Sequence, residues 1–212
     1  MSDSAIPHGS IVVVRHGETD WNIGRRIQGR TEIPLNETGR AQARAAAAIL
    51  RDTGAWTHVV SSPLGRAAET ASIIAEVLGL PAPGLDHGIL ERDFGPAEGL
   101  LVADAAARWP GLDVPGAETL AALAERGARA LSRHLHEAPG AVVVAHGALI
   151  RSTLSVLSGQ AAPRILNGEA WVLSPDPDGS PGPADPAALE ADARLPRALV
   201  RRLGAPARQH AI

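Results

Sequence analysis

Two short apolar runs, each followed by His-Gly, are the feature that most constrains this sequence. The runs are Ile11–Val14 and Ala141–Val144, and the histidines that follow them are His16 and His146. Uninterrupted aliphatic runs of this length are typical of strands buried on both faces of a parallel sheet. Ligands of such sheets bind beyond the carboxyl ends of the strands. If the two strands are neighbours, both imidazoles lie at one edge of the sheet, where each following glycine lets the backbone turn sharply.

The rest of the chain alternates between helical and strand patterns. Asn36 is a suitable N-cap for the first long helix, and Pro and Gly follow several of the later ones. The expected helices are 40–50, 66–78, 103–109, 119–136 and 149–157, and the further strands are 59–61 and 171–173. This order predicts an α/β fold with a mostly parallel central sheet flanked by helices on both faces.

The length of 212 residues suits a single domain, which we expect over residues 1–173. Residues 174–186, with the sequence SPDPDGSPGPADP, are too rich in Pro, Gly and Asp to hold a packed conformation and are expected to form a linker or loop. Residues 187–212 form a C-terminal tail. Within it, 187–203 is expected to be a helix, because Arg201 and Arg202 would stabilise its carboxyl end.

Missing residue types exclude several chemistries. The chain has no Cys and no Tyr, and all 20 of its basic side chains are Arg. Without Lys there can be no Schiff base and no phosphate-binding lysine of the P-loop or kinase type. Without Cys there can be no thiolate nucleophile, disulfide or thiolate metal site. Catalysis would therefore depend on His, Arg, carboxylates, hydroxyls or the backbone.

Net charge and hydropathy limit the possible binding partners and the cellular compartment of the protein. The formal net charge is −3, which gives no general attraction to nucleic acid or to an anionic membrane. The first ten residues lack the basic and apolar regions of a secretory signal, and no apolar stretch is long enough to span a bilayer. We therefore expect a cytoplasmic protein, and an exposed final strand or the tail helix could support a homodimer.

Charged residues accompany both histidines. Arg15 adjoins His16, Arg66 opens the second long helix, and Glu91 follows in a loop. A guanidinium matches phosphate oxygens, and a cation beside an imidazole lowers its pKa and keeps a lone pair available. The same cations would repel a divalent ion, so we expect neither a metal nor a cofactor. A neutral nucleophilic His among cations is suited to accept a phosphoryl group. Taken singly, Arg66 could instead be a solvated helix residue and Glu91 a partner of Arg92.

Five segments carry motifs that follow one another in order from about Ile11 to Leu173. The segments are Arg15–Thr19 with Trp21, Asn22, Arg26–Gly29, Pro34, Leu35, Gly39 and Gln42; Ser61–Leu64 with Arg66, Glu69 and Thr70; Glu91–Gly95 with Glu98 and Gly99; Gly116 with Glu118 and Thr119; and Ala145–Gly147 with Arg151. Together they resemble the phosphoglycerate-mutase-like branch of the histidine phosphatase superfamily.

The resemblance implies a role for each matching residue. His16 would be the nucleophile that forms a phosphohistidine, and Glu91 would protonate the leaving alkoxide and then help to activate water. Gln28 would contact a small phosphorylated substrate near the pocket entrance. The residues that would hold the phosphoryl oxygens are Arg15, Asn22, Arg66, His146 and Gly147.

Two residues depart from the pattern of the family. Ala97 stands where many members carry Trp, so one pocket wall is expected to be smaller, and Glu32 replaces an Asp in what we interpret as a matter of loop charge. Three functions are consistent with the sequence. The first is a metal-independent phosphomonoesterase, the second a phosphoglycerate-mutase-type phosphoryl transferase, and the third a catalytically silent phosphate-binding module. The short segment between Gly99 and Gly116 leaves little room for the insert of longer mutases and favours hydrolysis.

Overall fold

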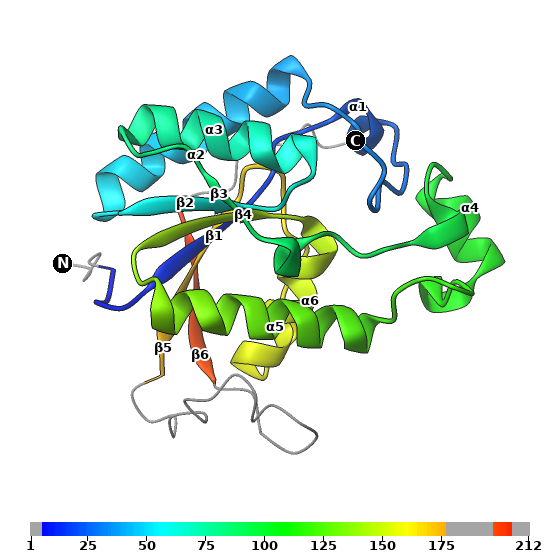
Figure 1. Ribbon diagram of the computed structural model, residues 1–212. Coiled ribbons are helices and arrows are strands. Elements are labelled where there is room, and N and C mark those ends of the chain that lie inside the picture. The colour runs from blue at the N-terminus through cyan, green and yellow to red at the C-terminus, as the bar shows by residue number, and fades with distance from the viewer. Residues whose placement is uncertain (1–5, 177–196, 205–212) are drawn as a thin grey trace.

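The computed structural model describes residues 6–176 and 197–204, and a six-stranded sheet lies at the centre of these residues (Figure 1). The strand order is β3-β2-β4-β1-β5-β6. The bounds are β1 Ile11–Arg15, β2 His58–Ser61, β3 Gly84–Leu85, β4 Ala141–Ala145, β5 Ala170–Pro175 and β6 Ala198–Leu203. The pairs among β3, β2, β4 and β1 are parallel, and those of β5 with β1 and β6 are antiparallel. The predicted mostly parallel sheet is confirmed.

The central strands β1 and β4 are the two apolar runs, and they are neighbours. They pair in parallel from Val12 with Val142 to Arg15 with Ala145. Their valines pack on both faces of the sheet, because Val13 belongs to one apolar cluster and Val12 to the cluster on the opposite face. Burial on both faces explains why neither run alternates with polar residues.

Helices cover both faces of this sheet, as predicted. The bounds are α1 Asp20–Ile23, α2 Glu37–Thr53, α3 Gly65–Leu78, α4 Val102–Arg108, α5 Leu120–Glu137 and α6 Gly147–Ser158. Figure 1 shows α2 and α3 on one face and α5 and α6 on the other. The Asn36 side chain accepts a hydrogen bond from Gly39 N at 2.8 Å and begins α2, and Thr119 begins α5 in the same way.

Small residues bring α2 close to the loop that follows β1. A Cβ atom built on Gly17 would lie 2.2 Å from the carbonyl oxygen of Gly39, so only a glycine fits at position 17. Gly17 N also donates to Thr70 Oγ1 in α3 at 3.1 Å. The backbone after β1 is therefore fixed against two helices directly beside His16.

The carboxyl-terminal helix expected over 187–203 is wrong in its described part. Residues Ala198–Leu203 form β6, which pairs with β5, and 187–196 lie outside the described residues together with most of the expected linker. Ala198 packs with the cluster on the α5 side, whereas Leu203 packs with the cluster on the α2 side. This distribution of side chains over both faces suits a strand, and pairing with β5 decides the structure over helix propensity.

A smaller apolar cluster lies beside the main sheet, where α4 and its flanking loops pack. It contains Ile27, Ala97, Ala105 and Val114. The backbone around Ile27 pairs here with the backbone around Gly99, since Ile27 N donates to Leu100 O and Gly99 N donates to Ile27 O. Ala97 is fully buried in this cluster and does not line the cavity described below, so the expected effect on a pocket wall is wrong.

Candidate active site

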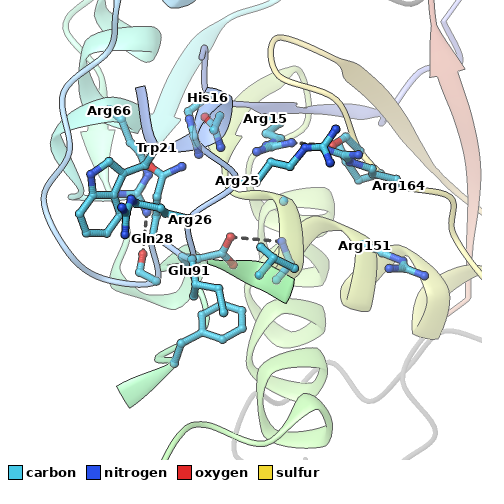
Figure 2. A pocket seen from close by; sticks show the side chains of 18 of the residues that line it. Arg15, His16, Trp21, Arg25, Arg26, Gln28, Arg66, Glu91, Arg151 and Arg164 are labelled. Carbon is cyan, nitrogen blue, oxygen red and sulfur yellow. Dashed lines mark hydrogen bonds between the residues drawn. The ribbon is translucent and has the colours of Figure 1, made fainter. Parts of the chain in front are cut away.

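A cavity of about 620 Å³ opens at the carboxyl ends of β1 and β4. Loops after β1, the start of α6 and the α6–β5 connection supply its walls. Its lining includes six arginines and a single carboxylate, that of Glu91; the arginines are Arg15, Arg25, Arg26, Arg66, Arg151 and Arg164. Figure 2 shows Arg66 and Gln28 on one side of the cavity and Arg15 and Arg164 on the other, with His16 between them.

The two predicted histidines lie side by side. Their ring centroids are 5.2 Å apart with an angle of 58° between the ring planes, and His16 N donates to Ala145 O at 3.0 Å. His16 Nδ1 lies 2.7 Å from the carbonyl oxygen of Gly17. Because a carbonyl only accepts, Nδ1 carries the proton and the lone pair resides on Nε2. The lone pair that His16 can offer to a ligand is therefore that of Nε2.

Burial keeps both imidazoles neutral. Desolvation, followed by the charges of Arg15 and Arg66, lowers the pKa of His16 well below its ordinary 6.5. Desolvation, followed by the Arg66 charge, has the same effect on the pKa of His146. His146 Nε2 lies 2.8 Å from Ser62 Oγ, while its Nδ1 is buried and has no hydrogen-bond partner among the described residues.

Arg15 and Arg66 are held by backbone carbonyls rather than by carboxylates. Arg15 donates to Ile165 O at 2.7 Å, and the fully buried Arg66 donates through its two terminal nitrogens to Gly29 O at 2.6 Å and Thr31 O at 2.9 Å. Burial lowers the pKa of Arg15 to about 10, so its side chain remains cationic at neutral pH, and burial also lowers the pKa of Arg66 from its ordinary 12.5. Neither Nε has an acceptor in the described part of the chain. Anionic oxygens in the cavity would find donors that the protein leaves unused.

Glu91, in the loop after Ile89, lies on the opposite side of the cavity from His16, with its carboxylate against the beginning of α6 (Figure 2). Its carboxylate accepts hydrogen bonds from Leu149 N at 3.0 Å, Ala148 N at 3.2 Å and Arg92 N at 2.9 Å. These contacts replace the expected alternative of a simple ion pair with Arg92. The helix start and the positive end of its dipole hold this carboxylate in the wall.

Asn22, Gln28 and Gly147 also line the cavity, whereas the fully buried His146 is not among its lining residues. Asn22 Oδ1 accepts from Thr19 N, which leaves the Nδ2 end as the donor. Gln28 Oε1 is buried and has no partner among the described residues. A Cβ atom on Gly147 would lie 3.2 Å from Arg15 Nε, so glycine lets the guanidinium lie against the start of α6.

Asn167 is a residue that the sequence analysis missed. Its Nδ2 lies 3.1 Å from His16 O, 3.2 Å from Gly17 O and 3.1 Å from Asn22 Oδ1. It thereby joins the α6–β5 connection to the loop after β1. Asn167 is distant in sequence from the residues that it contacts and lies outside every recognisable motif, so no sequence signal could have identified it.

The described residues contain neither a metal-binding cluster nor a membrane-spanning helix. Among residues 6–176 and 197–204, no group of three or more His, Cys, Asp or Glu side chains is arranged to hold a metal ion. Within the same ranges, no helix combines the length and the apolar character needed to cross a bilayer.

Comparison with known proteins places the chain in a family context. A model of the histidine phosphatase superfamily (branch 1) matches residues 11–170. The uncharacterized phosphatase PhoE of Bacillus subtilis is 42% identical over 152 residues, which cover 71% of this chain and 78% of that protein. Phosphoglycerate mutase-like protein 4 of Arabidopsis thaliana is 40% identical over 194 residues, with coverage of 79% and 84%. A mycobacterial glucosyl-3-phosphoglycerate phosphatase, solved with VO3, has a TM-score of 0.74 at 28% identity and covers 90% of this chain and 96% of its own.

The neutral state of the histidines can be tested by NMR. Because burial lowers the pKa values of His16 and His146 well below 6.5, their imidazole signals should keep the shifts of neutral rings from pH 8 down to about pH 6. Signals are assigned by their loss in His16→Ala and His146→Ala. A midpoint near 6.5 for either ring would contradict this. Because only the unfolded chain binds these protons below about pH 6.5, the free energy of unfolding should also decrease as pH falls.

Proposed function

The chain belongs to the histidine phosphatase superfamily, and on that premise we propose that it is a metal-independent phosphomonoesterase that acts through a phosphohistidine on His16. The observation that carries this proposal is the position of His16. Its neutral ring, protonated on Nδ1, lines a cavity with six arginines and one carboxylate. Phosphoryl transfer depends mainly on positioning and on stabilising negative charge, which such a cavity provides.

The proposed reaction has two displacements. In the first, His16 Nε2 attacks phosphorus in line with the ester oxygen, the P–O bond breaks, and Glu91 donates a proton to the departing alkoxide. In the second, Glu91 takes a proton from water as the water oxygen attacks the phosphohistidine, which releases inorganic phosphate and neutral His16. Arg15, Arg66 and His146 stabilise the phosphoryl oxygens during both steps.

A second candidate function is mutase-type transfer of the phosphoryl group. Arg151 lies one helical turn after Gly147 on α6, and Arg164 adjoins Ile165, whose carbonyl accepts from Arg15. These two cations line the cavity beyond the phosphoryl clamp and could hold a second anionic group, as a phosphoglycerate carries. With 3-phosphoglycerate and a bisphosphoglycerate primer, isomerisation faster than phosphate release would favour this second function.

Phosphate release from p-nitrophenyl phosphate in the presence of a chelator tests hydrolysis directly. The wild-type protein should release phosphate with EDTA present, and His16→Ala should lower kcat by ~10⁴-fold or more, because the nucleophile is removed. His136→Ala, which changes an exposed histidine on α5, serves as the matched control and should retain activity. Release that persists unchanged in His16→Ala, or no release by the wild type from any phosphomonoester tested, would contradict the proposal.

The role of Glu91 is tested by comparing leaving groups. Glu91→Gln should lower kcat/KM by ~10²–10⁴-fold for an alkyl phosphate, whose alkoxide must be protonated as it leaves. The loss should be much smaller for p-nitrophenyl phosphate, whose phenolate leaves without a proton. Because kcat/KM reports only steps up to the first irreversible one, the second displacement does not obscure the comparison. Equal losses on both substrates would show that Glu91 is not the acid, and Glu125→Gln, at an exposed position on α5, controls for loss of a carboxylate.

A further inference from the structure

Glu98 accepts an unusual number of hydrogen bonds for a residue outside the cavity wall. Its Oε1 accepts from Arg30 N at 2.9 Å and Phe94 N at 3.2 Å. Its Oε2 accepts from Thr31 N at 2.9 Å and Thr31 Oγ1 at 2.5 Å. Glu98 is half-buried and is not among the residues that line the cavity. Its carboxylate therefore holds the loop around Arg30 and lies outside the lining of the cavity.

The loop that Glu98 holds is the one that fixes Arg66. The two carbonyls that accept from the Arg66 guanidinium are Gly29 O and Thr31 O, at 2.6 and 2.9 Å. The side chain of Arg66 reaches the cavity from α3, opposite Arg15 (Figure 2). Because Arg66 is fully buried, these two carbonyls determine which way its remaining donors point.

One peptide group connects the carboxylate to the guanidinium. The N–H of Arg30, which donates to Glu98, and the carbonyl of Gly29, which accepts from Arg66, belong to the same peptide unit. The described chain has no cis peptide bond, so this unit is trans and planar, and its N–H and C=O point in opposite directions. Hydrogen bonds at the two ends of such a group polarise each other. A carboxylate that accepts from the N–H therefore strengthens the hydrogen bond between the Gly29 carbonyl and the Arg66 guanidinium.

The close approach of Glu98 to this peptide requires glycine at position 29. Gly29 has a φ of +54°, and a Cβ atom there would lie 1.9 Å from Glu98 Oε1. The neighbouring Glu32 adds a second connection, because its Oε2 accepts from Gly65 N at 2.9 Å at the start of α3. Glu32 therefore binds the first N–H of α3, next to Arg66, a contact that the interpretation of its substitution as a matter of loop charge does not include.

From this chain of contacts we propose that Glu98 is a positioning residue that sets the orientation of Arg66 for the phosphoryl group. The proposal rests on the proposed function, since it assigns Arg66 to the phosphate clamp. Glu98 acts through the Gly29–Arg30 peptide and the Thr31 backbone, without touching the substrate. In Glu98→Gln one acceptor oxygen becomes an NH₂ group that faces N–H donors, so the loop loses up to half of these contacts.

A double-mutant cycle between Glu98 and Arg66 tests this coupling. Glu98→Gln should lower kcat/KM for p-nitrophenyl phosphate by about tenfold, and Arg66→Gln should lower it by ~10²–10³-fold, as loss of a preorganised donor does. In the Arg66→Gln background, Glu98→Gln should change kcat/KM by less than about twofold, because the group it positions is absent. Glu125→Gln should have no effect in either background. An undiminished tenfold loss in the Arg66→Gln background would overturn the proposal.

The same double-mutant cycle can be measured through the equilibrium binding of orthovanadate, which involves no turnover. Glu98→Gln should weaken vanadate binding in the wild-type background and leave it unchanged in the Arg66→Gln background, whereas equal weakening in both would overturn the proposal. Failure of the proposed function is distinguishable, because the wild type would then bind vanadate but release no phosphate. Thermal unfolding of each variant identifies loss of folding. Glu98→Asp supplies a second variant that keeps the charge with a shorter reach and should be weakened less than Glu98→Gln.

Discussion

The parallel pairing of β1 with β4 is the constraint on which the candidate site depends. The register that places Arg15 opposite Ala145 also places the next residues, His16 and His146, side by side at the carboxyl edge of the sheet. Both strands are buried on both faces, so the imidazoles that follow them are desolvated. Desolvation and the neighbouring guanidinium charges act in the same direction on their pKa values, and the rings stay neutral. A neutral imidazole next to permanent cations follows from strand pairing and the placement of two arginines.

The arginines depend on loops for their orientation. A guanidinium has five N–H donors, and in both Arg15 and Arg66 some of these are held by backbone carbonyls while Nε has no acceptor in the described residues. The chain has no lysine, whose compact charge lacks this planar fork. The loops that supply the carbonyls are fixed in turn by polar side chains, with Glu98 binding the loop around Arg30 and Asn167 binding the backbone after His16. The geometry of the cavity thus rests on residues that do not belong to the proposed chemistry.

The central strands, the helices and the facing histidines could be predicted from the sequence, because each leaves a local signal. Uninterrupted apolar runs indicate buried strands, and Asn36 is a recognisable cap. The contributions of Asn167 and Glu98 could not be predicted, since they are tertiary hydrogen bonds between distant loops. The strand β6 was missed because Ala198–Leu203 has no strong pattern of its own and is organised by its pairing with β5. Ala97 was assigned to a pocket wall on its place in a motif, whereas packing against Ile27 and Val114 puts it in a small apolar core.

The covalent intermediate is the central claim, and trapping it is the most direct measurement. The wild-type protein is mixed with p-nitrophenyl phosphate, quenched within milliseconds to seconds under alkaline conditions that preserve phosphohistidine, and analysed by intact mass and peptide mapping. We predict a gain of one phosphoryl group, located on the peptide that contains His16 and absent from His16→Ala. Phosphate release without any labelled protein at the earliest times, or a label on another residue that persists in His16→Ala, would contradict it.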